Sequence, residues 1–105
     1  MPVNHPNELS SFKALLAKHE YVVVDFSATW CGPCKVIAPK FEELSNKPAY
    51  KKWTFCKVDV DEASDISDHY QVSAMPTFIF IKNGVVVGKF SGANVAMLES
   101  KLNSL

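Results

Sequence analysis

The stretch "VVVDFSATWCGPCK", residues 22–35, predicts a buried strand that leads directly into a helix. The strand, "YVVVDFSA" over residues 21–28, is rich in β-branched and aromatic residues and apolar on both faces, as expected of a central strand covered on both sides. Past the two cysteines, Ile37 and Phe41 lie one helical turn apart, and Pro39 between them should bend the helix. The two thiols therefore fall at a strand-to-helix junction.

Strand and helix patterns alternate along the rest of the chain, without a linker or repeat that would divide it. The dipeptide Asn83-Gly84 between two apolar runs is a strong hairpin signal, so the last two strands should pair antiparallel. This order predicts one α/β domain over residues 1–105, with helices on both faces of a mixed sheet. The other expected elements are a helix over 7–18 capped by Asn7, a strand over 53–60, a short helix through 63–70, strands over 77–82 and 85–90, and a closing helix over 95–105.

Composition excludes several classes of partner. The chain has 105 residues, 48% of them hydrophobic, which is enough for a packed core that needs neither metal nor disulfide, so the cysteines are free for chemistry. Its 11 basic residues are all lysines and balance 11 acidic ones, which argues against nucleic acid as a partner. The longest apolar run holds about six residues against the roughly 20 that span a bilayer, so we expect a soluble protein without a membrane partner.

The number of cysteines and the N-terminal sequence indicate the compartment. Three cysteines are an odd and small set, unlike the dense, even sets of secreted scaffolds, so a reducing compartment such as the cytosol is favoured. The N-terminal "MPVNHPNELSSF" shows no targeting signal.

The two thiols at the junction are suited to disulfide exchange. The start of a helix favours a thiolate by up to about 2 kcal/mol, which makes Cys31 the expected nucleophile and the exposed one of the pair. Cys34 follows one turn later and could attack a mixed disulfide on Cys31 as an intramolecular nucleophile. Gly32 allows the sharp turn of the backbone into the helix. Pro33 has its φ already fixed near the helical value, and it stands in the first turn, where the N–H that proline lacks would have no partner in the helix.

Two alternatives remain for the cysteines. A zinc site would need Cys56 and His69 as further ligands, but these are predicted on a strand and a helix rather than on a shared turn. A structural disulfide fits poorly with a reducing compartment.

Asp25 is the second chemical signal, because a carboxylate stands where an interior strand should carry Val or Ile. Burial without full pairing would raise its pKa and make it a base near neutral pH, able to take the proton of Cys34. Lys57, inside the strand over 53–60, could be its charge partner. The alternative is a paired, purely structural ion.

The whole chain resembles the thioredoxin family. The resemblance rests on "VVVDFSATWCGPCK", Pro39, "KVDVDE", "AMPTF" and "FSGAN", in the order and at the spacing that the family uses. It implies a thioredoxin fold, with a central mixed five-stranded β-sheet flanked by four α-helices in three α/β/α layers. Ser27 replaces a tryptophan of many bacterial members, so the chain looks like the animal type. The segment "EASDISDHYQVSA" lacks the extra cysteines of many animal members, so we expect a monomer rather than a redox-linked dimer.

The resemblance implies a protein-disulfide reductase, a thiol–disulfide oxidoreductase that binds no cofactor or metal. Cys31 would attack a substrate disulfide and Cys34 would resolve the mixed disulfide, leaving a Cys31–Cys34 disulfide. Asp25 and Lys57 match the family's buried acid and its lysine, and Met75-Pro76 is implied to be a cis peptide. The implied substrate surface consists of Trp30, Gly32, Pro33, Met75, Pro76, Gly92 and Ala93.

The implied partners follow from the same family. Thioredoxin reductase would re-reduce the disulfide with electrons from NADPH. Disulfide-containing proteins of the peroxiredoxin, ribonucleotide reductase and methionine sulfoxide reductase type would be the substrates. The expected location is the cytoplasm, and the sequence leaves a nuclear pool open. The competing hypothesis is a redox-sensitive protein-binding or regulatory module that uses the apolar surface around Trp30, Met75 and Gly92.

Overall fold

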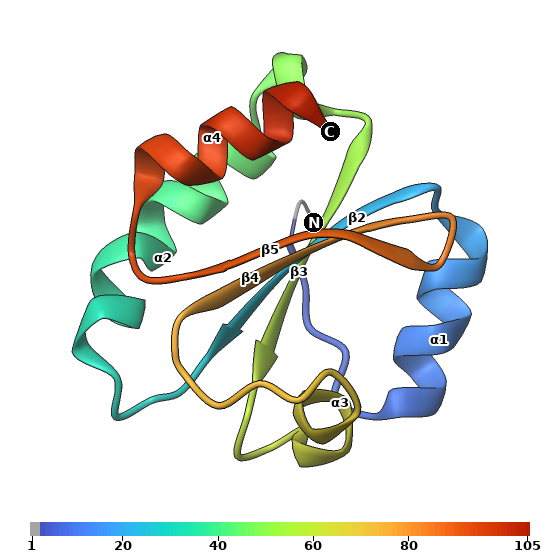
Figure 1. Cartoon of the computed structure of the whole chain (residues 1–105), viewed down its shortest axis with the longest axis vertical. Helices are drawn as coiled ribbons and strands as arrows, with labels where there is room; N and C mark the ends of the chain where they lie inside the picture. The colour runs from blue at the N-terminus through green and yellow to red at the C-terminus, as the bar shows by residue number, and fades with distance from the viewer. Residues whose placement is uncertain (1–2) are drawn as a thin grey trace.

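The structure, a computed structural model, describes residues 3–105 and consists of one mixed sheet between two layers of helices (Figure 1). The strands lie in the order β1-β3-β2-β4-β5. Strands β1 and β2 pair parallel with β3, whereas β4 runs antiparallel to both β2 and β5. The elements are β1 (Val3–Asn4), α1 (Leu9–Lys18), β2 (Tyr21–Ser27), α2 (Gly32–Ser45), a 3-10 turn (Pro48–Tyr50), β3 (Trp53–Asp59), α3 (Ser64–His69), β4 (Thr77–Lys82), β5 (Val85–Ser91) and α4 (Val95–Ser104).

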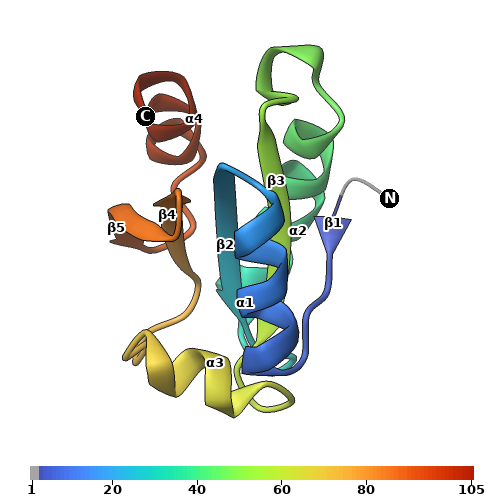
Figure 2. The same cartoon turned by 90° about the vertical axis from the view of Figure 1, so that its right-hand side faces the viewer.

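The alternation of side chains along β2 explains the three layers. Val23 packs into a core with α2 and α4, whereas Val22 and Val24 point to the opposite face and pack with α1 and α3. Figure 2 shows the sheet between these layers, with α1 in front of the strands and α2 behind them. The sheet is thus covered on both faces, and the predicted α/β/α fold with a central β2 is confirmed.

The hairpin between β4 and β5 follows from its turn residues. Asn83 and Gly84 have φ of 52° and 79°, the left-handed region that an Asn-Gly turn requires. The predicted antiparallel hairpin is confirmed, and Lys82 faces Val85 across it.

Two features of the N-terminal region differ from the sequence prediction. The resemblance implied a fifth strand, but its residues were not located in the sequence, because the two residues of β1 are too few to form a pattern. The prediction that Asn7 caps the first helix is wrong, because the N-cap is Glu8 and no side chain next to it in sequence caps the turn. Instead, the backbone N–H of Leu9 donates a hydrogen bond of 2.7 Å to the Asp65 carboxylate of α3. A distant side chain therefore replaces the local cap.

The bond between Asp65 and Leu9 predicts that Asp65→Ala lowers the free energy of unfolding by about 1 kcal/mol, as loss of a helix cap does. The matched control is Asp68→Ala on the same helix, which should change stability by less than about 0.5 kcal/mol. Urea unfolding of the oxidised protein measures both. Equal effects of the two substitutions would show that the bond to Leu9 contributes nothing specific.

Candidate active site at the start of α2

Cys31 and Cys34 form a disulfide where β2 leads into α2, with their Cα atoms 5.3 Å apart. Cys31 is the N-cap of α2 and keeps an extended backbone, with φ of −91° and ψ of 112°. The backbone N–H of Cys34 donates to the Cys31 sulfur at 3.2 Å. One of the free N–H groups of the first turn therefore points at the sulfur, as expected for a thiolate site.

The disulfide is more enclosed than the sequence suggested. The exposed fraction is 6% for Cys31 and 3% for Cys34, so the prediction that Cys31 is the exposed thiol is wrong. The cause is an apolar cluster in which Ala28, Val60 and Met75 pack against the two cysteines. A partner must therefore dock closely against this surface to reach either sulfur.

The segment before β4 forms the opposite wall of the site. The Met75–Pro76 peptide bond is cis, and the carbonyl oxygen of Met75 lies 3.7 Å from the Cys31 sulfur. Pro76 is buried, and its carbonyl accepts a hydrogen bond of 2.8 Å from the N–H of Gly92, a residue with φ of 108°. The fold thus brings the "AMPTF" and "FSGAN" segments of the sequence together near the disulfide.

Two large apolar side chains close to the cysteines in the chain are exposed. The Trp30 side chain is 66% exposed, and its indole N–H donates a hydrogen bond of 2.8 Å to the Asp61 carboxylate. Val36, one turn beyond the exposed Pro33, is 77% exposed. Sequence reasoning did not find Asp61 or Val36, because an acid after a strand and a valine in a helix carry no signal of their own. An exposed, fixed indole beside a buried disulfide is suited to contact a protein surface.

Asp25 lies in the middle of β2 and is fully buried, and neither of its carboxylate oxygens has a hydrogen-bond partner within residues 3–105. Burial raises the pKa of Asp25 from 3.8 to about 7, and the positive charge of Lys57 lowers the pKa by a smaller amount. Lys57 is the Cα partner of Asp25 on β3, yet the described residues contain no ion pair between the two. Asp25 is therefore a carboxyl that titrates near neutral pH.

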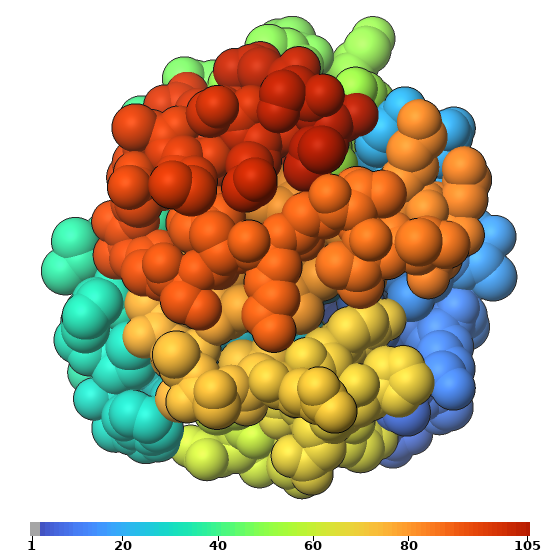
Figure 3. Space-filling model, in the orientation of Figure 1, coloured from blue at the N-terminus to red at the C-terminus, as the bar shows by residue number. Residues whose placement is uncertain are grey.

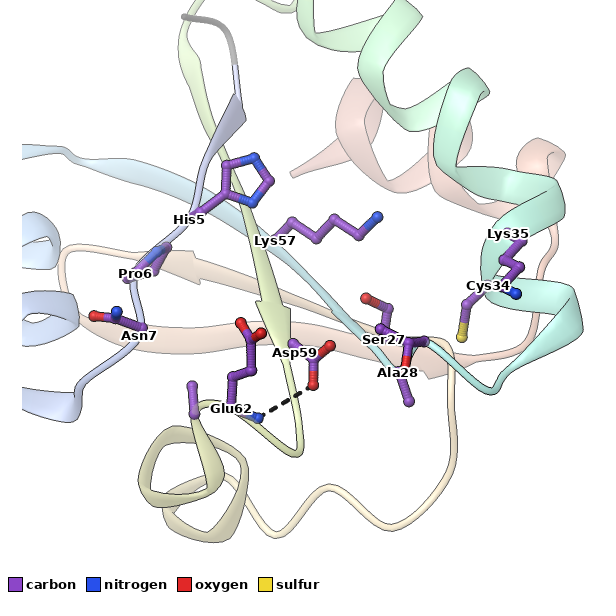
Figure 4. A pocket seen from close by; sticks show the side chains of 12 residues that line it. His5, Pro6, Asn7, Ser27, Ala28, Cys34, Lys35, Lys57, Asp59 and Glu62 are labelled. Atoms are coloured by element: carbon purple, nitrogen blue, oxygen red, sulfur yellow. Dashed lines mark hydrogen bonds between the residues drawn. The ribbon is translucent and has the colours of Figure 1, made fainter.

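A cavity of about 440 Å³ lies beside Cys34 and is also lined by Lys57, the Cα partner of Asp25 on β3 (Figure 4). Ser27 lies on the same face of β2 as Asp25 and lines this cavity, together with Cys34 and Lys57. Lys57 from β3 and Cys34 from α2 point into the same space in Figure 4. The cavity is large and polar enough to hold water, which can carry a proton between Cys34 and the sheet.

Neither a metal site nor a membrane-spanning helix is present in the part of the chain that the structure describes. No group of His, Cys, Asp and Glu side chains in residues 3–105 could hold a metal ion. Cys56 is fully buried on β3, and burial raises the pKa of its thiol to about 12, so it stays a neutral apolar side chain. Within the same residues, every helix is too short or too polar to cross a bilayer.

Comparisons with known proteins agree with this geometry. The family model described as Thioredoxin matches residues 3–104. Thioredoxin of Ictalurus punctatus is 50% identical over 103 residues, which cover 96% of each chain. The oxidised form of mitochondrial thioredoxin 3 from Saccharomyces cerevisiae superposes with a TM-score of 0.91 and 41% identity over 98% of this chain and 95% of that one. A second solved chain is 40% identical and superposes with a TM-score of 0.91 over 98% of this chain and 95% of that one. Its structure is described as the basis of thiol resolution in a yeast mitochondrial 1-Cys peroxiredoxin via the glutathione and thioredoxin systems.

The raised pKa of Asp25 predicts how stability depends on pH. Asp25 of the unfolded chain ionises near pH 3.8 and that of the folded protein near pH 7, so folding becomes less favourable between these values. The stability that the neutral Asp25 carboxyl contributes is fully present below about pH 4 and is lost as pH rises through about 7. Between these values the free energy of unfolding falls by about 1.4 kcal/mol per pH unit, or about 4 kcal/mol in total. Asp25→Asn removes this loss, so the variant should gain stability over the wild type with rising pH and level off above about pH 7.

Urea unfolding of both oxidised proteins over this pH range measures the difference. Asp68→Asn, which removes an exposed carboxylate, is the matched control and should show no such trend. A constant difference between Asp25→Asn and the wild type at all pH values would contradict a raised pKa.

Proposed function

The chain belongs to the thioredoxin family and is a protein-disulfide reductase, and we propose that Cys31 is its attacking thiol and Cys34 its resolving thiol. The observation that supports these roles best is the hydrogen bond from the Cys34 N–H to the Cys31 sulfur. The same N–H would stabilise a thiolate on Cys31 in the reduced protein. Cys34, one turn into α2, has no such position at the helix start.

The proposed reaction proceeds in two exchanges. The Cys31 thiolate attacks one sulfur of the substrate disulfide, which forms a mixed disulfide and releases the other substrate sulfur as a thiolate. Cys34 then loses its proton and attacks the Cys31 sulfur, which breaks the mixed disulfide and releases the second substrate thiolate. Two electrons have passed to the substrate, and the Cys31–Cys34 disulfide remains.

We assign the proton of Cys34 to Asp25, by way of the cavity that Ser27 and Cys34 line. A carboxylate with a pKa of about 7 is matched to proton transfer at neutral pH. Lys57 is a positioning residue in this proposal. Its charge favours the carboxylate form of Asp25 without an ion pair that would hold the pKa low.

The proposed substrate surface contains the half-buried Met75 and the exposed Trp30, which directly precedes Cys31 in the chain. The Met75 carbonyl next to the Cys31 sulfur could accept a hydrogen bond from an extended substrate segment. Gly32, Pro33, Pro76, Gly92 and Ala93 would complete this surface.

For the partners, we propose a thioredoxin reductase that supplies electrons from NADPH, and protein disulfides of the peroxiredoxin, ribonucleotide reductase and methionine sulfoxide reductase type. The similarity to the chain from the yeast 1-Cys peroxiredoxin structure supports peroxiredoxins as one class of substrate. The proposal also includes a single domain over residues 1–105 that acts as a monomer in the cytoplasm.

The wild-type protein, given a thioredoxin reductase and NADPH, should reduce insulin disulfides, measured as NADPH oxidation. Cys31→Ser should abolish the reaction, because the attacking sulfur is gone. Cys34→Ser should stop after one exchange and accumulate the mixed disulfide, detectable by mass spectrometry. Cys56→Ala is the control and should keep the activity, since this thiol is buried away from the site. An active Cys31→Ser variant would refute the assigned roles.

The base role of Asp25 predicts a selective effect on the second exchange. Reduced protein and Ellman's reagent release one coloured thiolate when Cys31 attacks and a second when Cys34 resolves. Near pH 7, Asp25→Ala should leave the first phase unchanged and slow the second by on the order of 10²-fold, the lower range for a positioned base. Stopped-flow absorbance separates the phases, with Asp68→Ala as the control. Equal second phases in Asp25→Ala and wild type would make Asp25 a structural residue only.

A second function is supported by the exposed apolar side chains of Trp30 and Val36. They could bind a partner whose regulation depends on the redox state of the dithiol. A Cys31→Ser, Cys34→Ser double variant that keeps full biological activity would favour this binding module over the reductase.

A further inference from the structure

Charge is polarised along the strands, although the chain as a whole is neutral. β2 and β3 are parallel, so both begin at one end of the molecule and both end near the disulfide. Acidic residues lie at the end of β3 and beyond it: Asp59, Asp61, Glu62, Asp65 and Asp68. Lysines gather where β2 and β3 begin and β4 ends: Lys18, Lys51, Lys52 and Lys82. The end of the molecule opposite the disulfide is therefore basic.

Two of these lysines share one aromatic ring. The Nζ atoms of Lys52 and Lys82 lie 4.5 Å and 5.1 Å from the centre of the Tyr21 ring. Neither lysine forms an ion pair with any residue in the range 3–105. Each ammonium therefore rests on an aromatic ring rather than on a carboxylate of the described residues, and the two charges add to the positive potential of this end.

A shallow groove of about 510 Å³ extends this basic end between α1 and the β4–β5 hairpin. Glu20 is the one acidic residue among those that line the groove. The lining residues are Lys13, Leu16, Ala17, Lys18, His19, Glu20, Asn83 and Gly84.

The hairpin next to the groove exposes three consecutive valines. Val85, Val86 and Val87 are 63%, 44% and 41% exposed on β5, an edge strand of the sheet. Figure 3 shows the hairpin, in orange, at the edge of the molecule beside α1 in blue. Val85 lies opposite Lys82 and Val86 opposite Ile81, so neighbouring valines project from the two faces of the hairpin. An uncovered apolar edge of this kind indicates a binding surface.

We propose that this end of the molecule binds the surface of an anionic lipid bilayer. Val85–Val87 would enter the boundary between headgroups and acyl chains, and Lys13, Lys18, Lys52 and Lys82 would contact the lipid phosphates. A bilayer accounts for both the lysines and the valines, whereas an acidic protein segment accounts for the lysines alone. Nucleic acid fits poorly, because the Tyr21 ring is occupied by lysines and is not free to stack on bases.

This proposal revises the expectation that the protein has no membrane partner. That expectation rested on the length of apolar segments, which excludes a spanning helix within residues 3–105 but not attachment to the surface. The orientation leaves the disulfide accessible. β2 begins at Tyr21 in the basic end and ends at Ser27, so the dithiol lies about 20 Å from the lipid at about 3.3 Å per residue.

Flotation of the full chain with vesicles tests the proposal. We expect the protein to float with vesicles containing about one-third phosphatidylserine at low salt, and not with pure phosphatidylcholine. Lys18→Gln, Lys82→Gln should lower the partition coefficient about 25-fold, at about 5-fold for each lysine. The matched control, Lys35→Gln, Lys40→Gln on α2, removes the same charge elsewhere and should retain partitioning. Absence of flotation of the wild type, or equal losses in both double variants, would overturn the proposal.

The apolar contribution needs a separate variant. Val85→Thr, Val86→Thr keeps the branched shape of both side chains and should lower partitioning several-fold, with insulin reduction in solution unchanged. Unchanged partitioning of this variant would contradict insertion of the hairpin. Light scattering tests whether a second copy covers the valines instead: a concentration-dependent dimer of the wild type that the threonine variant lacks would overturn the bilayer as the occupant.

Discussion

The hydrogen bond from the Cys34 N–H to the Cys31 sulfur determines how the rest of the site works. It requires Cys31 to stay extended while α2 begins at the next residue, so the end of β2 and the start of the helix must be fixed relative to each other. The two cores on either face of β2 provide this rigidity, because each clamps alternate side chains of the same strand. Disulfide chemistry therefore takes place on a rigid junction, and the parts brought to it, Met75 and Trp30, come from loops that the sheet holds in place.

Asp25 shows how the same sheet raises the pKa of a buried carboxyl at the cost of stability. A salt bridge to Lys57 would satisfy the carboxylate, but it would also lower the pKa and leave a weak base. The structure instead keeps the carboxyl buried without a partner, with Lys57 near enough to act through its charge alone. Burial has the larger effect, and the resulting pKa of about 7 is one at which a proton can be both accepted and returned. In the reaction that we propose, the unpaired carboxylate would be explained by proton transfer from Cys34 rather than by folding.

Much of the fold was predictable because local patterns and tertiary packing agree. β2 is apolar on both faces and lies at the centre of the sheet, and Asn83-Gly84 forms the expected hairpin. Predictions failed where a distant residue decides the outcome. Asp65 supplies the cap that Asn7 was expected to form, and Met75 and Val60 enclose a cysteine that its position in the sequence suggested was exposed. No pattern linked Asp61 to Trp30, since a hydrogen bond between residues 31 positions apart leaves no periodicity to detect.

The polarity of charge along the strands has different causes at the two ends. Near the disulfide, two of the acidic side chains form local hydrogen bonds. The Asp59 carboxylate accepts from the N–H groups of Asp61 and Glu62, and the Asp61 carboxylate accepts from the indole N–H of Trp30. At the far end, Lys52 and Lys82 cap no helix and pair with no carboxylate among residues 3–105. Their contacts with the Tyr21 ring leave both positive charges without an acidic partner among the described residues. A net charge of zero conceals this difference, which appears only once parallel β2 and β3 place the two groups of charges at opposite ends.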